Sequence, residues 1–208
     1  MTDSTGWPAI PEDEMAAFHQ TADVFLNTAN GLVGQEPQQQ VGAAFLYAGA
    51  RFTAFAMQSQ VEEGAEVDLT TRDWLTARFD EELRDHAAQQ LRREAWTPVA
   101  PGQVPDAAID VLMGINELTE EPRRAFMRLA DRFIHPANDM IEEVAIARIS
   151  AAMMHACTRF NAYVLQARGL SPGPLDENIA TDFRNAFRAL LDFHLGQSVV
   201  TERGQGQE

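Results

Sequence analysis

Residues 18–30 read FHQTADVFLNTAN, and residues 126–138 read FMRLADRFIHPAN. The apolar residues of the first stretch, Phe18, Ala22, Phe25 and Ala29, are spaced alternately by four and three positions. This spacing places them on one side of an amphipathic α-helix. The same residues recur in the second stretch, 108 positions later. The sequence therefore predicts one amphipathic helix that occurs twice.

The repeat continues well beyond this helix. Two further pairs of segments share the offset of 108 positions: 43–55 with 151–163, and 79–86 with 187–194. An ungapped comparison of residues 18–86 with residues 126–194 gives 17 identities in 69 positions, where average residue frequencies predict roughly four. The chain therefore contains an internal duplication.

Each copy is predicted to form three helices. The apolar and small residues of 41–55 mark a second helix that a neighbouring helix can approach closely, and those of 74–91 mark a third. Thr70, with Asp73 three positions later, is expected to cap the third helix. In the second copy, residues 139–148 contain no glycine or proline. The first two helices of that copy are therefore expected to run on, with a kink at Pro136.

We expect an all-α fold of two tandem three-helix units, related by an approximate two-fold axis and forming one compact body. The alternative is two units that touch only lightly. The expected segments are an N-terminal tail (1–10), a first helical repeat (11–96), a Pro-rich linker with a short helix (97–118), a second helical repeat (119–196) and a disordered tail (197–208).

The composition excludes several classes of function. The chain carries 16 basic and 31 acidic residues, a formal net charge of −15, which repels nucleic acids and anionic membranes. All basic residues are arginines, so neither a Schiff-base lysine nor a P-loop lysine is available. We expect no nucleic-acid partner and no membrane partner.

The predicted location is the cytoplasm. The first residues are acidic and polar and do not resemble a signal peptide. The apolar groups are short, far from the ~20 consecutive apolar residues of a membrane helix. The one cysteine, Cys157, cannot form an intrachain disulfide.

Four polar residues recur beside the predicted core, and with His155 they make up the candidate site. These residues are Asp23, Asn30, Arg51 and His86 in the first copy, and Asp131, Asn138, His155, Arg159 and His194 in the second. In one interpretation, buried aspartate–arginine pairs fix the register of the helices. In the other, the residues line a polar pocket for a small anionic or polar ligand, which arginine would bind.

No catalytic residue, cofactor or metal ion is predicted. Cys157 follows His155 by two positions, and side chains two positions apart on a helix point in nearly opposite directions. These two residues therefore cannot form a Cys–His catalytic pair. Asp131, His135 and Asp139 are spaced by four, but Pro136 is expected to interrupt their helix. Glu82 precedes His86 by four residues, whereas the Glu-x-x-His motif of di-iron bundles has a spacing of three.

The first copy resembles a small proteobacterial family, domain of unknown function 3144. The residues that carry the resemblance are Ala22-Asp23-x-Phe25, Ala29-Asn30 and the run from Leu46 to Phe55. The second copy departs from the pattern, with His155 in place of Tyr47 and Cys157-Thr158 in place of Gly49-Ala50. The resemblance implies a short all-helical unit, here present twice, and it implies no activity.

Two classes of function stay open. The first is a non-catalytic helical module that binds another protein, with an acidic face meeting a basic partner. The second is a small-ligand-binding protein or enzyme that uses a cluster in the second copy, formed by Asp131, Asn138, His155, Arg159 and His194. The chain is expected to be a monomer with an internal pseudo-dimer, or a weak homodimer.

Overall fold

The computed structural model describes residues 11–61, 67–91, 119–167 and 175–205. This part of the chain forms six α-helices and a short 3₁₀-helix, η1 (Glu12–Glu14), and it contains no strand. The first copy holds α1 (Met15–Leu32), α2 (Gln38–Gln58) and α3 (Leu69–Leu91), and the second holds α5 (Glu120–Asp139), α6 (Ile146–Ala167) and α7 (Glu177–Gln205). The predicted all-α class is confirmed.

The second and third helices begin at equivalent residues in the two copies. The second helices begin at Gln38 and Ile146, and the third helices begin at Leu69 and Glu177, each pair 108 positions apart. The turns before the second helices also match. Two consecutive backbone N–H groups donate to the carbonyl of Leu32 in the first copy and to that of Met140 in the second. The duplication is therefore visible in the backbone.

This match corrects the expected run-on helix of the second copy. Helix α5 continues through Pro136 to Asp139, a turn follows, and α6 begins at Ile146. Proline has no N–H to donate, which weakens the last turn of α5. The N–H groups of Met140 and Ile141 then bond to carbonyls three residues back, the tightening typical of a helix end. A turn therefore forms without glycine.

Each copy packs its first and third helices against the second helix of the other copy. Helices α1 and α3 pack on α6, and α5 and α7 pack on α2, whereas helices of the same copy make few contacts. Phe45 of α2 stacks on Phe133 of α5, with ring centroids 4.2 Å apart. The copies are interlocked around one core, so the alternative of two lightly touching units is wrong. A single copy of about 70 residues would bury little apolar surface by itself.

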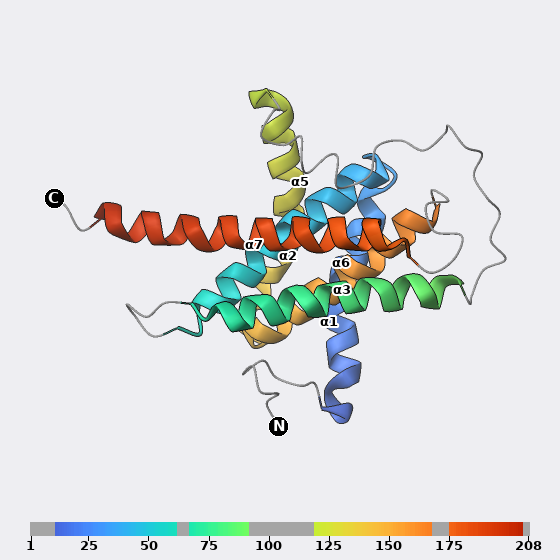
Figure 1. The fold of residues 1–208 in the computed structure, drawn as a ribbon, viewed down its shortest axis with the longest axis horizontal. Helices are drawn as coiled ribbons and strands as arrows, with labels where there is room; N and C mark the ends of the chain where they lie inside the picture. The colour runs from blue at the N-terminus through green and yellow to red at the C-terminus, as the bar shows by residue number, and fades with distance from the viewer. Residues whose placement is uncertain (1–10, 62–66, 92–118, 168–174, 206–208) are drawn as a thin grey trace.

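The approximate two-fold axis passes between equivalent residues of the two copies. Phe79 of α3 stacks on its counterpart, Phe187 of α7, with ring centroids 4.4 Å apart and planes 6° from parallel. Helices α3 and α7 lie side by side, while α1 and α5 extend in opposite directions (Figure 1). This arrangement is the one that a two-fold axis requires.

The central helices α2 and α6 cross at small residues, as the sequence predicted. Nearly every residue of α2 from Val41 to Met57 is buried, most of them alanine, glycine or aromatic. Two polar contacts join α2 to α6 at equivalent places: the hydroxyls of Thr53 and Ser150 lie 3.0 Å apart, and Asn161 donates to the carbonyl of Gly42. The copies are thus held in register at both ends of the crossing.

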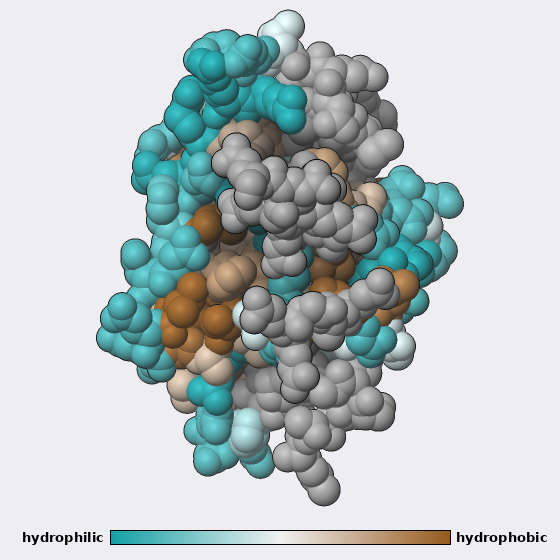
Figure 2. Space-filling model, turned by 90° about the vertical axis from the view of Figure 1, so that its left-hand side faces the viewer, coloured by the Kyte–Doolittle hydropathy of each residue, from teal (hydrophilic) through white to brown (hydrophobic). Residues whose placement is uncertain are grey.

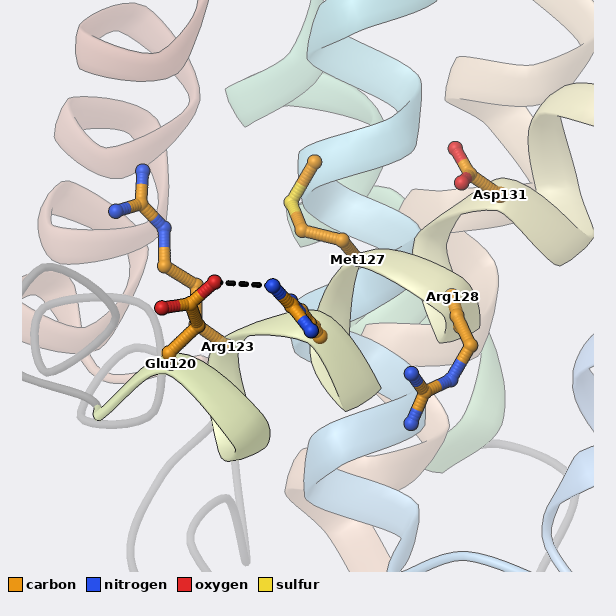
Figure 3. Close-up of a pocket in the computed structure, with 6 residues that line it drawn as sticks. Glu120, Arg123, Met127, Arg128 and Asp131 are labelled. Carbon is orange, nitrogen blue, oxygen red and sulfur yellow. Dashed lines mark hydrogen bonds and ion pairs between the residues drawn. The ribbon is translucent and has the colours of Figure 1, made fainter.

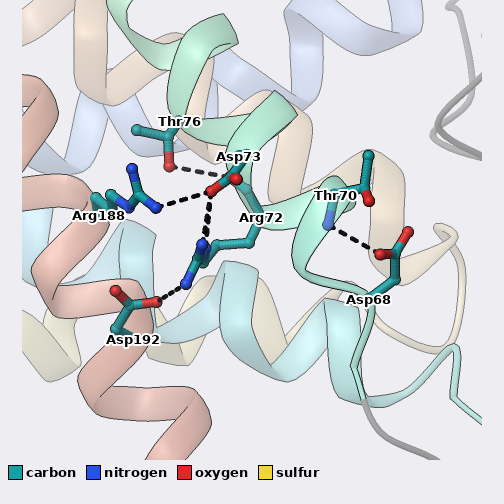
Figure 4. A network of polar contacts seen from close by, with 7 residues as sticks. All are labelled: Asp68, Thr70, Arg72, Asp73, Thr76, Arg188 and Asp192. Carbon is teal, nitrogen blue, oxygen red and sulfur yellow. Dashed lines mark hydrogen bonds and ion pairs between the residues drawn. The ribbon is translucent and has the colours of Figure 1, made fainter.

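Ion pairs flank the stacked phenylalanines between α3 and α7. Arg72 bridges Asp73 and Asp192, and Arg188 contacts the same Asp73 carboxylate at 3.1 Å (Figure 4). On the other side of the seam, Arg84 donates to Glu177 at 2.8 Å. These charges lie at the surface, so each pair contributes about 0–1 kcal/mol. Their arrangement favours the antiparallel register of the two helices.

The third helices begin with an aspartate cap. Asp68 accepts from the backbone N–H of Thr70 at 2.8 Å, and Asp176 accepts from that of Asn178 at the same distance. The expected cap at Thr70 is therefore wrong by two positions. Aspartate caps more strongly than threonine, and it is identical in the two copies.

The C-terminal tail differs from its expected structure, and other expected segments lie outside the described residues. A disordered tail was expected from residue 197, but α7 continues to Gln205, because extending an existing helix is easier than starting one. The N-terminal tail, the Pro-rich linker and the short helix expected within residues 106–116 lie outside the described residues. Among the described helices, none has the combination of length and apolar character needed to cross a membrane.

Candidate metal centre

The interlocked copies divide the predicted polar residues between two equivalent places. At the first, His86 of α3 meets His155 of α6, with ring centroids 4.6 Å apart. At the second, His194 of α7 meets Tyr47 of α2, with ring centroids 4.9 Å apart. Tyr47 is the counterpart of His155 in the repeat. Each place joins one copy to the other, so the residues of the second copy are distributed rather than gathered into one cluster.

One predicted aspartate–arginine pair is found, at the surface. Arg51 donates to Asp131 of the other copy at 3.2 Å, and the two side chains are 44% and 43% exposed. The expected burial of this pair is wrong, because the arginine reaches along the edge of the core. The equivalent Arg159 and Asp23 are also exposed, as are Asn30 and Asn138.

Glu82 completes the first place. It lies one turn before His86 on α3, and both residues are only 8% exposed. Its Oε2 atom is 3.4 Å from Nδ1 of His155, and its Oε1 atom accepts from Nε of Arg78 at 3.0 Å. Two buried atoms of this place, Oε2 of Glu82 and Nε2 of His86, make no hydrogen bond among the described residues, although Oε2 lies near His155. Buried polar atoms without a partner are rare and costly, so this pair requires an explanation.

A metal ion bound by these three residues would explain it. One ligand atom from each of Glu82, His86 and His155 lies within 4.8 Å of the other two. Two ligands of a tetrahedral zinc ion are about 3.4 Å apart, given metal–ligand bonds of about 2.1 Å. Oε2 of Glu82 and Nδ1 of His155 are already 3.4 Å apart. Rotation of the His86 side chain would bring its ligand atom to the same distance from them.

The protonation of His86 suits metal binding. Burial, assisted by the nearby His155, lowers the pKa of His86 from 6.5 to about 4. The imidazole is therefore neutral at pH 7, as a metal ligand must be. The second place shares this property, because burial also lowers the pKa of His194 to about 4.

The second place lacks the other ligands. The counterparts of Glu82, His86 and His155 are Leu190, His194 and Tyr47. Leucine offers no ligand atom, and burial raises the pKa of Tyr47, so its phenol stays protonated. Among the described residues, the first place therefore offers three potential metal ligands, whereas the second place offers only His194 of the equivalent three.

The spacing of Glu82 and His86 was interpreted as evidence against a metal site, although it also carries a signal in favour of one. Residues four apart lie on the same face of a helix, so Glu82 and His86 point in one direction. The expectation of no metal site depended on the Glu-x-x-His motif of di-iron bundles, in which the two residues are three positions apart on one helix. His155 reaches the site from the other copy, a contact that helix periodicity does not predict.

Cys157 lies apart from this chemistry. Its side chain is buried, it accepts from the amide of Asn161 at 3.4 Å, and burial raises its pKa. A protonated, buried thiol is a poor nucleophile. The prediction that Cys157 acts as a small core residue agrees with this environment.

A pocket on α5 has the character of a solvated helix face. It has a volume of about 560 Å³, and three of its lining residues are arginines (Figure 3). Arg124 pairs with Glu120, and Arg128 lies 3.7 Å from Glu121. Acids of the same helix therefore neutralise two of the three arginines, and the pocket does not include the histidines.

The fold and this site define an all-α, internally duplicated protein with a polar centre between its two copies. The family model for a protein of unknown function, DUF3144, matches residues 18–91 and again residues 126–199. The chain therefore belongs to the DUF3144 family and contains two tandem copies of its domain. Neither the curated proteins nor the solved structures that were compared include a match.

Proposed function

We propose that this protein binds one divalent transition-metal ion between its two copies, through Glu82, His86 and His155. The observation that carries the proposal is the convergence of the three ligand atoms within 4.8 Å at a largely buried place. Of the two classes of function left open by the sequence, this geometry supports ligand binding.

The ligand types favour some metals over others. Two imidazoles and one carboxylate suit Zn²⁺, Fe²⁺, Ni²⁺ or Cu²⁺, whereas Mg²⁺ and Ca²⁺ prefer oxygen ligands alone. Zn²⁺ is also bound by two histidines and a glutamate in known catalytic sites. Zn²⁺ is therefore the first ion to test.

Arg78 supports the proposed site from outside it. Its guanidinium holds Oε1 of Glu82 at 3.0 Å, which leaves Oε2 directed at His155. A carboxylate held in this way would bind the metal through one oxygen. Such outer partners orient metal ligands, and their loss typically lowers metal affinity about 10- to 100-fold.

Calorimetric titration with Zn²⁺ tests the proposal. We expect the full chain to bind one ion, and Glu82→Gln and His86→Gln to abolish this binding. His194→Gln is the matched control, because it replaces an equally buried histidine at the equivalent place. Zn²⁺ at 100 times its dissociation constant should stabilise the parent protein by about 2.7 kcal/mol.

Two results would contradict the proposal. The first is a parent protein that does not bind Zn²⁺, Fe²⁺, Ni²⁺ or Cu²⁺, which would leave Glu82 and His155 as a structural pair. The second is an equal loss of binding in His86→Gln and His194→Gln. That result would show an effect of folding rather than of ligation.

A second candidate function is binding to another protein, and one observation favours it. Phe55 and Tyr163, equivalent residues of α2 and α6, are 43% and 44% exposed. Figure 2 shows a face on which apolar side chains gather between polar ones. The double variant Phe55→Ser, Tyr163→Ser should lose a basic partner captured from native cells by the parent protein. Equal capture would contradict this function.

A cytoplasmic location also stays a prediction, which cell fractionation tests.

A further inference from the structure

We infer that His19 of α1 is a fourth ligand, which closes the metal site and makes it structural. This inference rests on the proposed function and specifies it. Three protein ligands with an open position are typical of catalytic zinc sites, and four are typical of structural ones. The identity of the fourth ligand therefore decides between two kinds of site.

His19 lies beside His155, just outside the group of three converging ligand atoms. Its ring centroid is 5.7 Å from that of His155, and the centroids of His86 and His155 are 4.6 Å apart. Two imidazoles bound to one tetrahedral zinc ion have ring centroids about 5 Å apart, given Zn–N bonds of about 2.0–2.1 Å. Both observed separations lie within an ångström of this value. His155 is thus flanked by a histidine on each side at nearly the spacing of shared ligation.

The side chain of His19 is free to complete the site. It is exposed, whereas its neighbour Phe18 is buried and packs edge-on against His155 with ring centroids 5.4 Å apart. Phe18 therefore packs α1 against α6 at this place, and the His19 side chain would have to rotate to reach the other ligands. No hydrogen bond or ion pair of the imidazole within the described residues opposes that rotation.

The duplication provides an internal comparison. The counterpart of His19 is Met127, so this position also differs between the two equivalent places. The first place offers Glu82, His86, His155 and His19, and the second offers Leu190, His194, Tyr47 and Met127. All four positions of the first place hold strong metal ligands, whereas only one of the four equivalent positions at the second place does. This contrast indicates that His19 belongs with the other three ligands.

The consequence is a metal that joins three helices. Glu82 and His86 come from α3, His19 comes from α1, and His155 comes from α6 of the other copy. A bound ion would connect both outer helices of the first copy to the central helix of the second. With no position left for a substrate, the ion would stabilise the fold and would not catalyse a reaction.

Binding of Co²⁺, followed by its visible absorption, tests the inference on the full chain. We expect the intense bands of four-coordinate Co²⁺, and a loss of affinity on the order of 10- to 100-fold or more in His19→Ala, since even outer partners contribute that much. His135→Ala, which removes an exposed histidine of α5, and Met127→Ala should bind like the parent. His19→Cys should bind Co²⁺ and add a thiolate-to-metal charge-transfer band, which appears only if residue 19 touches the metal.

The outcomes separate this inference from the proposed function. Unchanged affinity in His19→Ala, with no charge-transfer band in His19→Cys, would overturn the fourth ligand and leave the three-ligand site intact. An equal loss of affinity in His135→Ala would also overturn it. Absence of Co²⁺ and Zn²⁺ binding by the parent protein would overturn the proposed function and this inference together.

Discussion

His86 and His194 occupy equivalent positions of the two copies, and both are buried with a pKa of about 4. Their neighbours differ, since His86 faces Glu82 and His155 while His194 faces Tyr47. The protein therefore contains two similar buried histidines, and only one of them lies among further metal ligands. Single-residue experiments can use one as the reference for the other.

The two histidines predict a loss of stability in mild acid. In the unfolded chain their pKa is near 6.5, so between pH 6.5 and about 4 the unfolded state binds more protons than the folded state. Stability is thus fully present above pH 6.5 and falls as the pH drops to about 4, by up to about 1.4 kcal/mol per pH unit for each histidine. Urea unfolding of the metal-free protein across this range measures the fall. His194→Gln should lower the slope by up to about 1.4 kcal/mol per pH unit, and an unchanged slope would contradict the assignment.

The second place should become a metal site when it receives the residues of the first. The triple variant Tyr47→His, Met127→His, Leu190→Glu adds three ligands around His194. We expect zinc stoichiometry by equilibrium dialysis to rise from one ion per chain to two. The variant should melt below the parent without Zn²⁺, since a carboxylate is now partly buried, and recover when Zn²⁺ is added. A stoichiometry that stays at one would show that the ligand types alone do not define the site.

Residue patterns predicted part of this chemistry. Recurrence identified His86 and His194, the departure from the repeat at position 155 identified His155, and the recurring residues suggested the pair that Arg51 forms with Asp131. Recurrence could not identify Glu82, because the second copy has leucine there, and the four-residue spacing of Glu82 and His86 does not match the Glu-x-x-His motif. Burial of Arg51 was also predicted wrongly, since a long side chain can start at the edge of the core and end in water.

Helix starts were the least accurate predictions at the level of the elements. Thr70 fits the capping pattern, but Asp68 two residues earlier caps α3, and Asp176 caps α7 in the same way. Only the repeat distinguishes the two candidates, because aspartate recurs after 108 positions and threonine does not. The turn before α6 was not predicted because residues 139–148 contain no glycine or proline. Helix α5 instead ends just after Pro136, which lacks a backbone donor.

The caps predict equal effects in the two copies. Asp68→Ala and Asp176→Ala each remove a carboxylate from the first turn of a third helix, and each should lower the free energy of unfolding by about 1 kcal/mol. Thr70→Ala, which removes the cap expected from the pattern, should have a smaller effect. Chemical denaturation monitored by circular dichroism measures all three. A larger effect of Thr70→Ala than of Asp68→Ala would contradict the observed capping.

At the level of the whole molecule, the duplication predicted two similar units in one body, but it did not predict how the helices of one copy pack on those of the other. A repeat shows which segments are equivalent, and it does not show whether a helix packs on its own copy or on the other. Here each outer helix packs on the central helix of the other copy, so the four outer helices together cover α2 and α6. The same choice places His155 beside Glu82 and His86 of the first copy, so the proposed metal site depends on the interlocking.

A chain cut once tests this interlocking most directly. A protease site introduced into the linker segment 97–105 would divide the protein into its two copies, and size-exclusion chromatography with circular dichroism would follow the fragments. Interlocked copies should elute together at the volume of the intact 23.0 kDa chain, and urea should separate them only as the helical signal is lost. Two fragments that elute separately while each keeps its helical signal would contradict a shared core.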